Sequence, residues 1–179
     1  MRIAARRRPA PEPGRAGGQS LVEFSLVLVP LMLLILGIVQ FGLIFNTYVT
    51  MTNAAREGAR SGTIYVYDRT LSKARNDADR NAAIQASVLD SMNLLAKTSP
   101  QFDDGPSWAQ SGTTFTSGDT RIVYATPEGV TDSDARTGQT ITIRVTYHQD
   151  LIIPMIAALL PQDANGRLAL PGEVTMVVN

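Results

Sequence analysis

Residues 14–45 read GRAGGQSLVEFSLVLVPLMLLILGIVQFGLIF, and this stretch decides the fold. A basic, glycine-containing segment leads into an apolar run in which no residue from Leu26 to Phe45 is charged. As an α-helix these 20 residues are about 30 Å long, which matches the hydrocarbon core of a bilayer. We therefore predict one membrane-spanning helix.

Glu23 stands at the front of this run and needs an explanation. An ionised group within the hydrocarbon costs about 2.5 to 3.5 kcal/mol even on insertion scales. One interpretation is that Glu23 lies only at the headgroup boundary and that Gly17-Gly18 is a linker. The other is that the two glycines let the chain leave the helix and enter the narrow cleft of a protease. The coincidence of these features favours the second interpretation.

The charge distribution predicts the orientation of the span. Residues 1–18 hold five arginines and one glutamate, a net charge of +4, whereas Arg56 and Arg60, separated by Glu57, are the only basic residues close behind the span. By the positive-inside rule, the N-terminus lies in the cytoplasm. A cleaved secretory signal is the alternative, although its apolar region normally has only about 7 to 15 residues.

Two motifs carry a family resemblance. Gly18, four further residues and then Glu23-Phe24 resemble the processing motif of type IV prepilins of the Flp type. Together with the apolar span, residues 41–62, FGLIFNTYVTMTNAAREGARSG, resemble the TadE-like family (TadE/TadG-like) of minor pilins in the tight adherence (Tad) pilus system. The motif-bearing resemblance covers residues 17–62.

The resemblance implies roles for these residues. A prepilin peptidase would cleave after Gly18 and leave a new amino group on Gln19. Glu23 would neutralise such an amine, often that of a neighbouring subunit, and Phe24 beside it would take part in recognition. The implied partners are the prepilin peptidase, other Tad pilins or assembly-platform proteins, and the membrane.

The resemblance and the sequence pattern together predict a pilin-like α+β fold. We expect a basic leader at residues 1–18, a transmembrane and extended helix at residues 19–67, and an external domain at residues 68–179. This domain would hold a second helix and an antiparallel sheet of about three strands. The protein would be a single-pass component of the bacterial cytoplasmic (inner) membrane with the domain outside, or would become associated with the pilus.

A stripe of small residues follows the span on the same predicted helix. The helix is expected to continue to about Tyr67. Ala55, Gly58, Ala59 and Gly62 recur at helical spacing within it, so another backbone can approach closely. Either a partner pilin or the protein's own globular domain would fill this surface, and both alternatives stay open.

A second helix is predicted from about Leu71 to Lys97. Apolar residues recur through it at mainly helical intervals. They are Leu71, Ala74, Ala78, Ile84, Val88, Met92 and Leu95. The charged residues are expected to face solvent largely. They are Lys73, Arg75, Asp77, Arg80 and Asp90.

The C-terminal half contains the strands. Apolar and polar residues alternate strictly from Thr140 to His148, which is typical of a half-buried strand. Residues 121–126 and 173–178 are the predicted partners, whereas residues 99–119 are rich in Gly, Ser, Thr and Asp and predict a long exposed loop.

The apolar segment 151–161, LIIPMIAALLP, is too short to cross a bilayer as a helix. An apolar segment of this kind is commonly buried in the core, and we favour burial over the sheet. The alternative is an exposed patch for a partner or a membrane surface.

Several other functions are disfavoured. The remainder of the chain after residue 18 has a net charge of −4 and offers no field for nucleic acid. Without cysteine the chain has no disulfide and no thiolate metal site, and the carboxylates near Asp77 and Asp132 fail the calcium-loop pattern. His148 is the only histidine, with no cysteine or nucleophile-elbow serine to activate. We expect no enzyme, metal or cofactor.

These observations predict a membrane-anchored minor pilin or pseudopilin-like subunit for Tad-type pilus assembly. Such a subunit is a substrate of the prepilin peptidase and not a catalyst. The alternative is an uncleaved single-span envelope protein whose external domain is adhesive or binds a partner.

Overall fold

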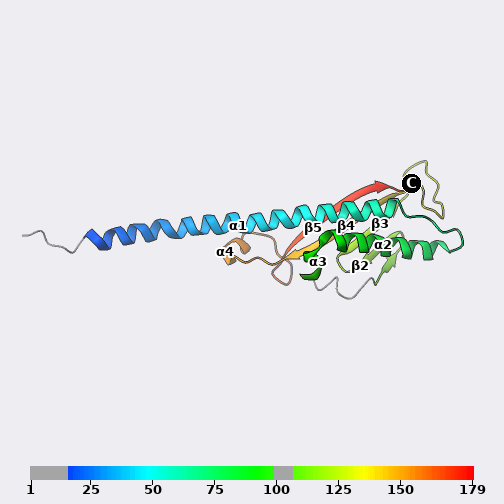
Figure 1. Ribbon diagram of the computed structural model, residues 1–179. Helices are drawn as coiled ribbons and strands as arrows, with labels where there is room; N and C mark the ends of the chain where they lie inside the picture. Colours follow the sequence, from blue (N-terminus) through cyan, green and yellow to red (C-terminus); the bar gives the residue numbers. More distant parts are fainter. Residues whose placement is uncertain (1–15, 99–106) are drawn as a thin grey trace, which may run out of the picture. The chain divides into compact units, whose positions relative to one another are not determined.

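The computed structural model describes residues 16–98 and 107–179. The chain divides into two compact units, residues up to Val39 and residues Gln40–Asn179. Helix α1, Ala16–Thr63, contributes to both units (Figure 1). The predicted leader lies almost entirely outside the described residues.

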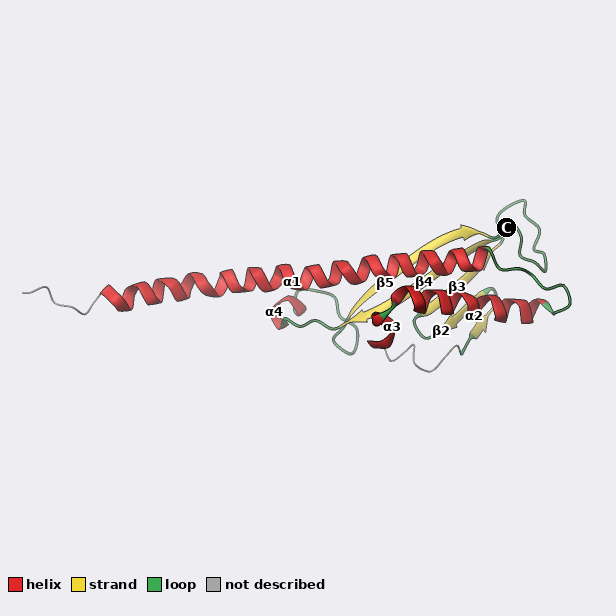
Figure 2. Cartoon of the chain, in the orientation of Figure 1, coloured by secondary structure: helices red, strands yellow, loops and turns green. Residues whose placement is uncertain are grey.

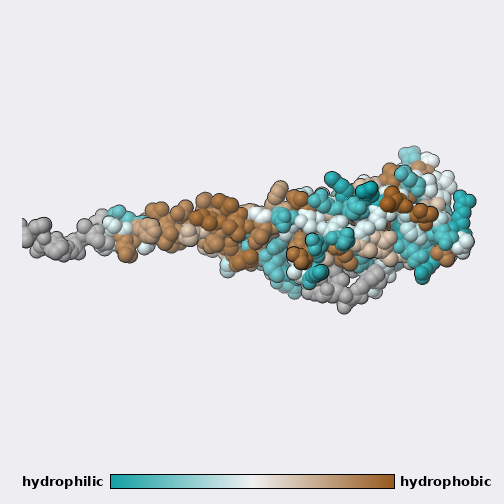
Figure 3. All heavy atoms as spheres, viewed as in Figure 1, coloured by the Kyte–Doolittle hydropathy of each residue, from teal (hydrophilic) through white to brown (hydrophobic). Residues whose placement is uncertain are grey.

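The unit up to Val39 consists, in its described part, of the beginning of α1. Its apolar side chains are exposed, and the visible face of this segment is hydrophobic (Figure 3). Within the described residues, the part of α1 from Ser20 to Thr63 is the one helix long and apolar enough to cross a membrane. Length and composition therefore support a single-pass anchor, as the sequence predicts.

Helix α1 ends at Thr63, four residues before the predicted end at Tyr67. The backbone N–H of Ile64 still bonds to the carbonyl of Arg60 at 3.2 Å, and the helical pattern then stops. Thr63, Ile64 and Val66 are β-branched, so they lose side-chain freedom in a helix and favour its termination.

The predicted second helix is divided into α2, Lys73–Met92, and α3, Leu94–Thr98. Ser72 caps α2, because its side chain accepts a hydrogen bond from the backbone N–H of Arg75. Asn93 separates the two helices with a φ of 53°, a positive value that is uncommon outside glycine. The helical pattern alone did not reveal this break.

The domain contains a five-stranded antiparallel sheet in the order β1-β2-β3-β4-β5 (Figure 2). The strands are β1 Ala109–Ser111, β2 Thr114–Ser117, β3 Thr120–Ala125, β4 Thr140–Gln149 and β5 Leu168–Val177. The α+β class is confirmed, but the predicted count of about three strands is too low. The two extra strands, β1 and β2, lie in the segment predicted as a loop. They are short and polar, and the turns around β2 use Gly112 and Gly118 at positive φ.

Helices α1 and α2 pack against the sheet to form the core. Ile122 of β3 and Ile143 of β4 are directly paired and fully buried. They belong to one apolar cluster with residues from both helices. From α1 and α2 these include Met51, Ala55, Ala59, Ile84, Val88 and Met92. The alternation predicted for β4 is confirmed, because Ile141, Ile143, Val145 and Tyr147 are all buried.

The segment 151–161 does not join this core. It contains the short helix α4, Pro154–Ala157, and three of its large side chains are exposed: Ile152 by 70%, Met155 by 61% and Leu159 by 84%. The prediction of burial over the sheet is therefore wrong. The buried residues of the sheet pack instead against α1 and α2.

Candidate functional site

The predicted processing residues lie at the beginning of α1. Gly18 and Gln19 are within its first turn, because the helix begins at Ala16. Glu23 and Phe24 follow one turn later with exposed side chains, and Phe24 is 65% exposed. Gln19 precedes Glu23 by four residues along α1, which is about one helical turn.

The local geometry leaves room around Gly18. A Cβ atom added to Gly18 would meet no heavy atom within 4 Å beyond its chain neighbours and its own helix. The first N–H groups of a helix lack intrahelical acceptors, and glycine is about 1 kcal/mol less favourable than alanine within a helix. The turn around Gly18 is therefore easier to unwind than the apolar turns that follow it.

The stripe of small residues faces the protein's own domain. Ala55, Gly58, Ala59 and Gly62 are all buried. A Cβ on Gly58 would lie 2.6 Å from Cγ2 of Val88 in α2. A Cβ on Gly62 would lie 2.7 Å from Cδ1 of Ile141 in β4 and 2.9 Å from Cδ1 of Ile84 in α2. The sequence left open whether a partner pilin or the protein's own domain fills this surface. In the structure the protein's own domain fills it.

Strand β5 approaches the backbone of α1 closely at Gly172, a contact that the sequence pattern did not predict. A Cβ on Gly172 of β5 would lie 2.3 Å from the carbonyl oxygen of Met51 and 2.8 Å from the amide nitrogen of Thr52. Only glycine allows the strand to approach the α1 backbone this closely. An isolated glycine inside a strand pattern was the available signal.

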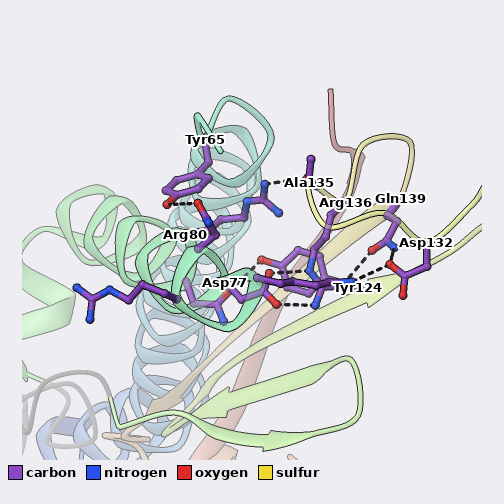
Figure 4. Close-up of polar contacts among 12 residues, drawn as sticks. Tyr65, Asp77, Arg80, Tyr124, Asp132, Ala135, Arg136 and Gln139 are labelled. Carbon is purple, nitrogen blue, oxygen red and sulfur yellow. Dashed lines mark hydrogen bonds and ion pairs between the residues drawn. The ribbon is translucent and has the colours of Figure 1, made fainter. Parts of the chain in front are cut away.

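A buried polar cluster joins α2 to the connection between β3 and β4 (Figure 4). It consists of Asp77, Arg80, Tyr124, Arg136 and Gln139. Nε and Nη2 of Arg136 each donate a 2.7 Å hydrogen bond to the Asp77 carboxylate, and Nη1 donates to Gln139 Oε1 at 3.0 Å. Arg80 is 2% exposed and Asp77 is 5% exposed. The prediction that these two residues face solvent is wrong, because their charges have partners inside the domain.

Aromatic rings complete the cluster. The Arg136 guanidinium lies 4.2 Å from the Tyr124 ring centroid, and that of Arg80 lies 5.0 Å from the Tyr65 centroid. The Tyr124 hydroxyl donates to Asn81 Oδ1 at 2.9 Å, and burial raises its pKa to about 12. Most polar groups of the cluster therefore bind one another, although Nε of Arg80 has no hydrogen-bond partner among the described residues, and the cluster acts as a structural cross-link.

His148 is held between two carboxylates. Its Nδ1 lies 2.7 Å from Asp163 Oδ2 and its Nε2 lies 3.3 Å from Asp119 Oδ1. Both ring nitrogens thus have partners, so neither is placed to activate a nucleophile. Within residues 16–98 and 107–179, no group of three or more His, Cys, Asp or Glu side chains is arranged to hold a metal ion.

Comparison with known proteins gives a match for the region around Gly18 and Glu23 and for the helix that follows it. No match was found among curated proteins or among solved structures. The family match lies entirely within α1 and begins at the residue after which cleavage is predicted. Residues 18–60 match the family model described as TadE-like protein, which confirms the resemblance predicted from the sequence.

Proposed function

We propose that this chain is a membrane-anchored minor pilin or pseudopilin-like subunit for Tad-type pilus assembly, processed by a prepilin peptidase after Gly18. The observation that carries the proposal is the TadE-like match over residues 18–60. This match includes both Glu23-Phe24 and the apolar run able to cross a membrane.

The position of Gly18 is consistent with its use as a cleavage site. It is exposed and lies in the first turn of α1, before the apolar run. Local unwinding of this turn disturbs none of the core packing, which begins in the unit from Gln40 onward. A peptidase at the membrane surface could then bind the extended chain.

Cleavage would create an amine whose natural partner is Glu23. The new N-terminus on Gln19 would be four residues from the carboxylate, and the same carboxylate could reach the amine of a neighbouring subunit. Bringing the two charges together reduces the penalty of placing either one near lipid. This pairing would dock the processed helix among other pilin helices.

The subunit would lie in the bacterial cytoplasmic (inner) membrane, with its N-terminus in the cytoplasm. Its external domain would then be outside, and other Tad pilins or assembly-platform proteins would be its partners. In this role the chain is a substrate of processing and a structural component. The packed, internally paired polar cluster supports such a structural role.

Processing is tested by N-terminal sequencing of the membrane form from bacteria with and without the prepilin peptidase. We expect Gln19 as the first residue when the peptidase is present and the intact leader when it is absent. An intact leader in both samples would exclude processing and favour the uncleaved binding protein. Membrane extraction at alkaline pH tests the anchor separately, because a spanning protein stays in the pellet.

A further inference from the structure

The segment 151–161 is held against α1 at Gln40. The backbone N–H of Ile152 donates to Gln40 Oε1 at 2.9 Å, and Gln40 is 1% exposed. At the end of β4, Thr47 Oγ1 donates to Gln149 Oε1 at 2.7 Å. Gln40 precedes Thr47 by seven residues, which is about 10 Å of helix rise. The chain leaving β4 therefore runs along α1 toward the apolar run.

Gln40 lies inside the apolar run of residues 26–45, which the polar residues Asn46 and Thr47 follow. It is five residues before the end of this run, or about 7.5 Å along the helix. Tyr48 follows the run and is 49% exposed, and tyrosines of this kind gather at membrane interfaces. If α1 spans the bilayer as proposed, Gln40 and the segment bound to it lie near the edge of the hydrocarbon.

The surface of the segment fits such a position. Ile152, Met155 and Leu159 are exposed by 70%, 61% and 84%, and no residue from 151 to 161 is charged. An isolated exposed apolar residue is ordinary, but several on one short uncharged segment mark a contact surface. The hydrogen bond between Ile152 and Gln40 joins this surface to the end of the apolar run in α1.

Six of the nine backbone N–H groups in the segment have partners within the protein, which suits a poorly hydrated site. The N–H groups of the five residues from Ile156 to Leu160 all bond to carbonyls within the segment. Pro154 and Pro161 have no N–H, and that of Ile152 is bound by Gln40. Backbone donors placed near lipid need such internal partners because water is scarce there.

We propose that residues 151–161 insert into the boundary between the headgroups and the hydrocarbon of the bilayer that α1 crosses. The segment would form a second, shallow membrane contact and shield Gln40 from lipid. Its uncharged apolar surface and its attachment within the apolar run favour lipid over a second copy of the chain. The inference rests on the proposed anchoring by α1, but not on cleavage after Gly18.

Site-directed spin labelling of the full chain tests this contact. The chain has no cysteine, so Met155→Cys, Leu31→Cys and Val66→Cys each give one labelling site. The proteins are reconstituted into vesicles of phosphatidylethanolamine and phosphatidylglycerol, and the label's accessibility to oxygen is compared with that to a water-soluble nickel chelate. Leu31 lies within the uncharged run, and Val66 is 85% exposed beyond α1. Leu159→Cys is a second probe in case Met155→Cys does not fold.

The two reference positions separate the possible failures. We expect the ratio of oxygen to nickel accessibility to be high at position 31 and low at position 66, with position 155 several-fold above position 66. A high ratio at 31 with equal ratios at 155 and 66 would overturn the membrane contact and leave the anchor standing. A label at 155 shielded from both reagents would also overturn it, in favour of contact with protein. A low ratio at 31 would overturn both the anchor and the inference.

Discussion

Arg136 and Asp77 form a buried, two-pronged ion pair. Nε of Arg136 donates to Oδ1 of Asp77 and Nη2 donates to Oδ2, each at 2.7 Å. The side chains are only 5% and 8% exposed. Burial lowers the pKa of the Arg136 guanidinium, but the hydrogen bonds and charge of Asp77 more than offset this, so the pKa is raised. Removal of Asp77 therefore leaves the buried Arg136 charge without its carboxylate partner.

Asp77→Ala is expected to lower the free energy of unfolding by about 3 to 5 kcal/mol, because the buried Arg136 charge loses its ion-pair partner. The measurement is urea unfolding of the full chain in detergent, followed by the fluorescence of Trp108. Asp79→Ala is the matched control on the same helix. The Asp79 side chain is 36% exposed and that of its partner Arg75 is 66% exposed. Loss of this exposed pair should change the free energy of unfolding by less than about 1 kcal/mol. Equal losses in both variants would contradict the structural role of the buried pair.

The sequence predicted the period of α2 but not the nature of its buried face. Ile84 and Val88 lie on that face, as the apolar pattern indicates. Asp77 and Arg80 continue the same face toward the N-terminus of α2, where the pattern assigned them to solvent. Hydrophobicity is a poor guide to burial where a charge has a partner from a distant segment. That partner, Arg136, is 59 positions away in the sequence.

Tyr124 predicts an alkaline loss of stability. Burial raises its pKa from 10.0 to about 12, so the folded domain favours the neutral hydroxyl. The stability that depends on the neutral Tyr124 hydroxyl is fully present below the pKa of Tyr124 in the unfolded chain. It is lost as the pH rises through the pKa of Tyr124 in the folded domain. A shift of about two units corresponds to about 3 kcal/mol. The free energy of unfolding should therefore fall between about pH 10 and pH 12, and this part of the decline should be absent in Tyr124→Phe.

Measurement of unfolding at several pH values in this range checks the prediction. Tyr67→Phe is the control for loss of a tyrosine, because Tyr67 lies outside the buried polar cluster. The wild type and Tyr67→Phe should share the steep decline. A decline of the same slope in Tyr124→Phe would assign the pH dependence to other groups.

The candidate processing motif was readable from the sequence because it is local. Gly18 and Glu23 lie on successive turns of one helix, so their relation follows from spacing alone. The contact between Gly172 and Met51 joins residues more than a hundred positions apart. No periodicity within β5 specifies which backbone approaches its glycine. Strands β1 and β2 were missed for a related reason, because pairing with neighbouring strands defines them and their own polarity pattern does not.

Gly172→Ala is expected to be strongly destabilising. The added Cβ would overlap the Met51 carbonyl, and backbone cannot move aside as a side-chain end can. A loss of about 3 kcal/mol, at the upper end of the usual range for overpacking, is expected in urea unfolding. Gly42→Ala is the control, since a Cβ there meets nothing within 4 Å. A stable Gly172→Ala protein would show that β5 and α1 are not in such close contact.

Gly18→Ala is expected to reduce processing strongly while leaving the fold unchanged. The folded chain has room for the new methyl group, so a loss of cleavage reports on recognition by the peptidase. Alanine also favours the helical turn by about 1 kcal/mol, which opposes the extended conformation that a protease needs. Gly42→Ala adds the same methyl group to open space on the same helix and should be processed normally. Immunoblotting for the cleaved form with peptidase present gives the comparison, and equal cleavage of both variants would remove Gly18 from the recognition site.

Glu23→Gln separates processing from assembly. The amide keeps the size of the side chain but cannot neutralise an amine, so the proposed docking loses its charge pair. We expect membrane insertion to be retained and incorporation into the pilus fraction to fall about tenfold or more, a difference of about 1.4 kcal/mol or more in docking. The measurement is the ratio of the subunit in sheared pili to that in membranes.

Glu57→Gln is the matched control for this test, since it removes a carboxylate from the same helix. Glu57 is 51% exposed and only 3.9 Å from the exposed Arg60, so its neutralisation should leave incorporation unchanged. If both variants assemble poorly, the loss reflects the general charge of α1. If Glu23→Gln is incorporated as well as the wild type, no pairing of this carboxylate with an amine is required. Docking would then depend on contacts of the subunit other than this carboxylate.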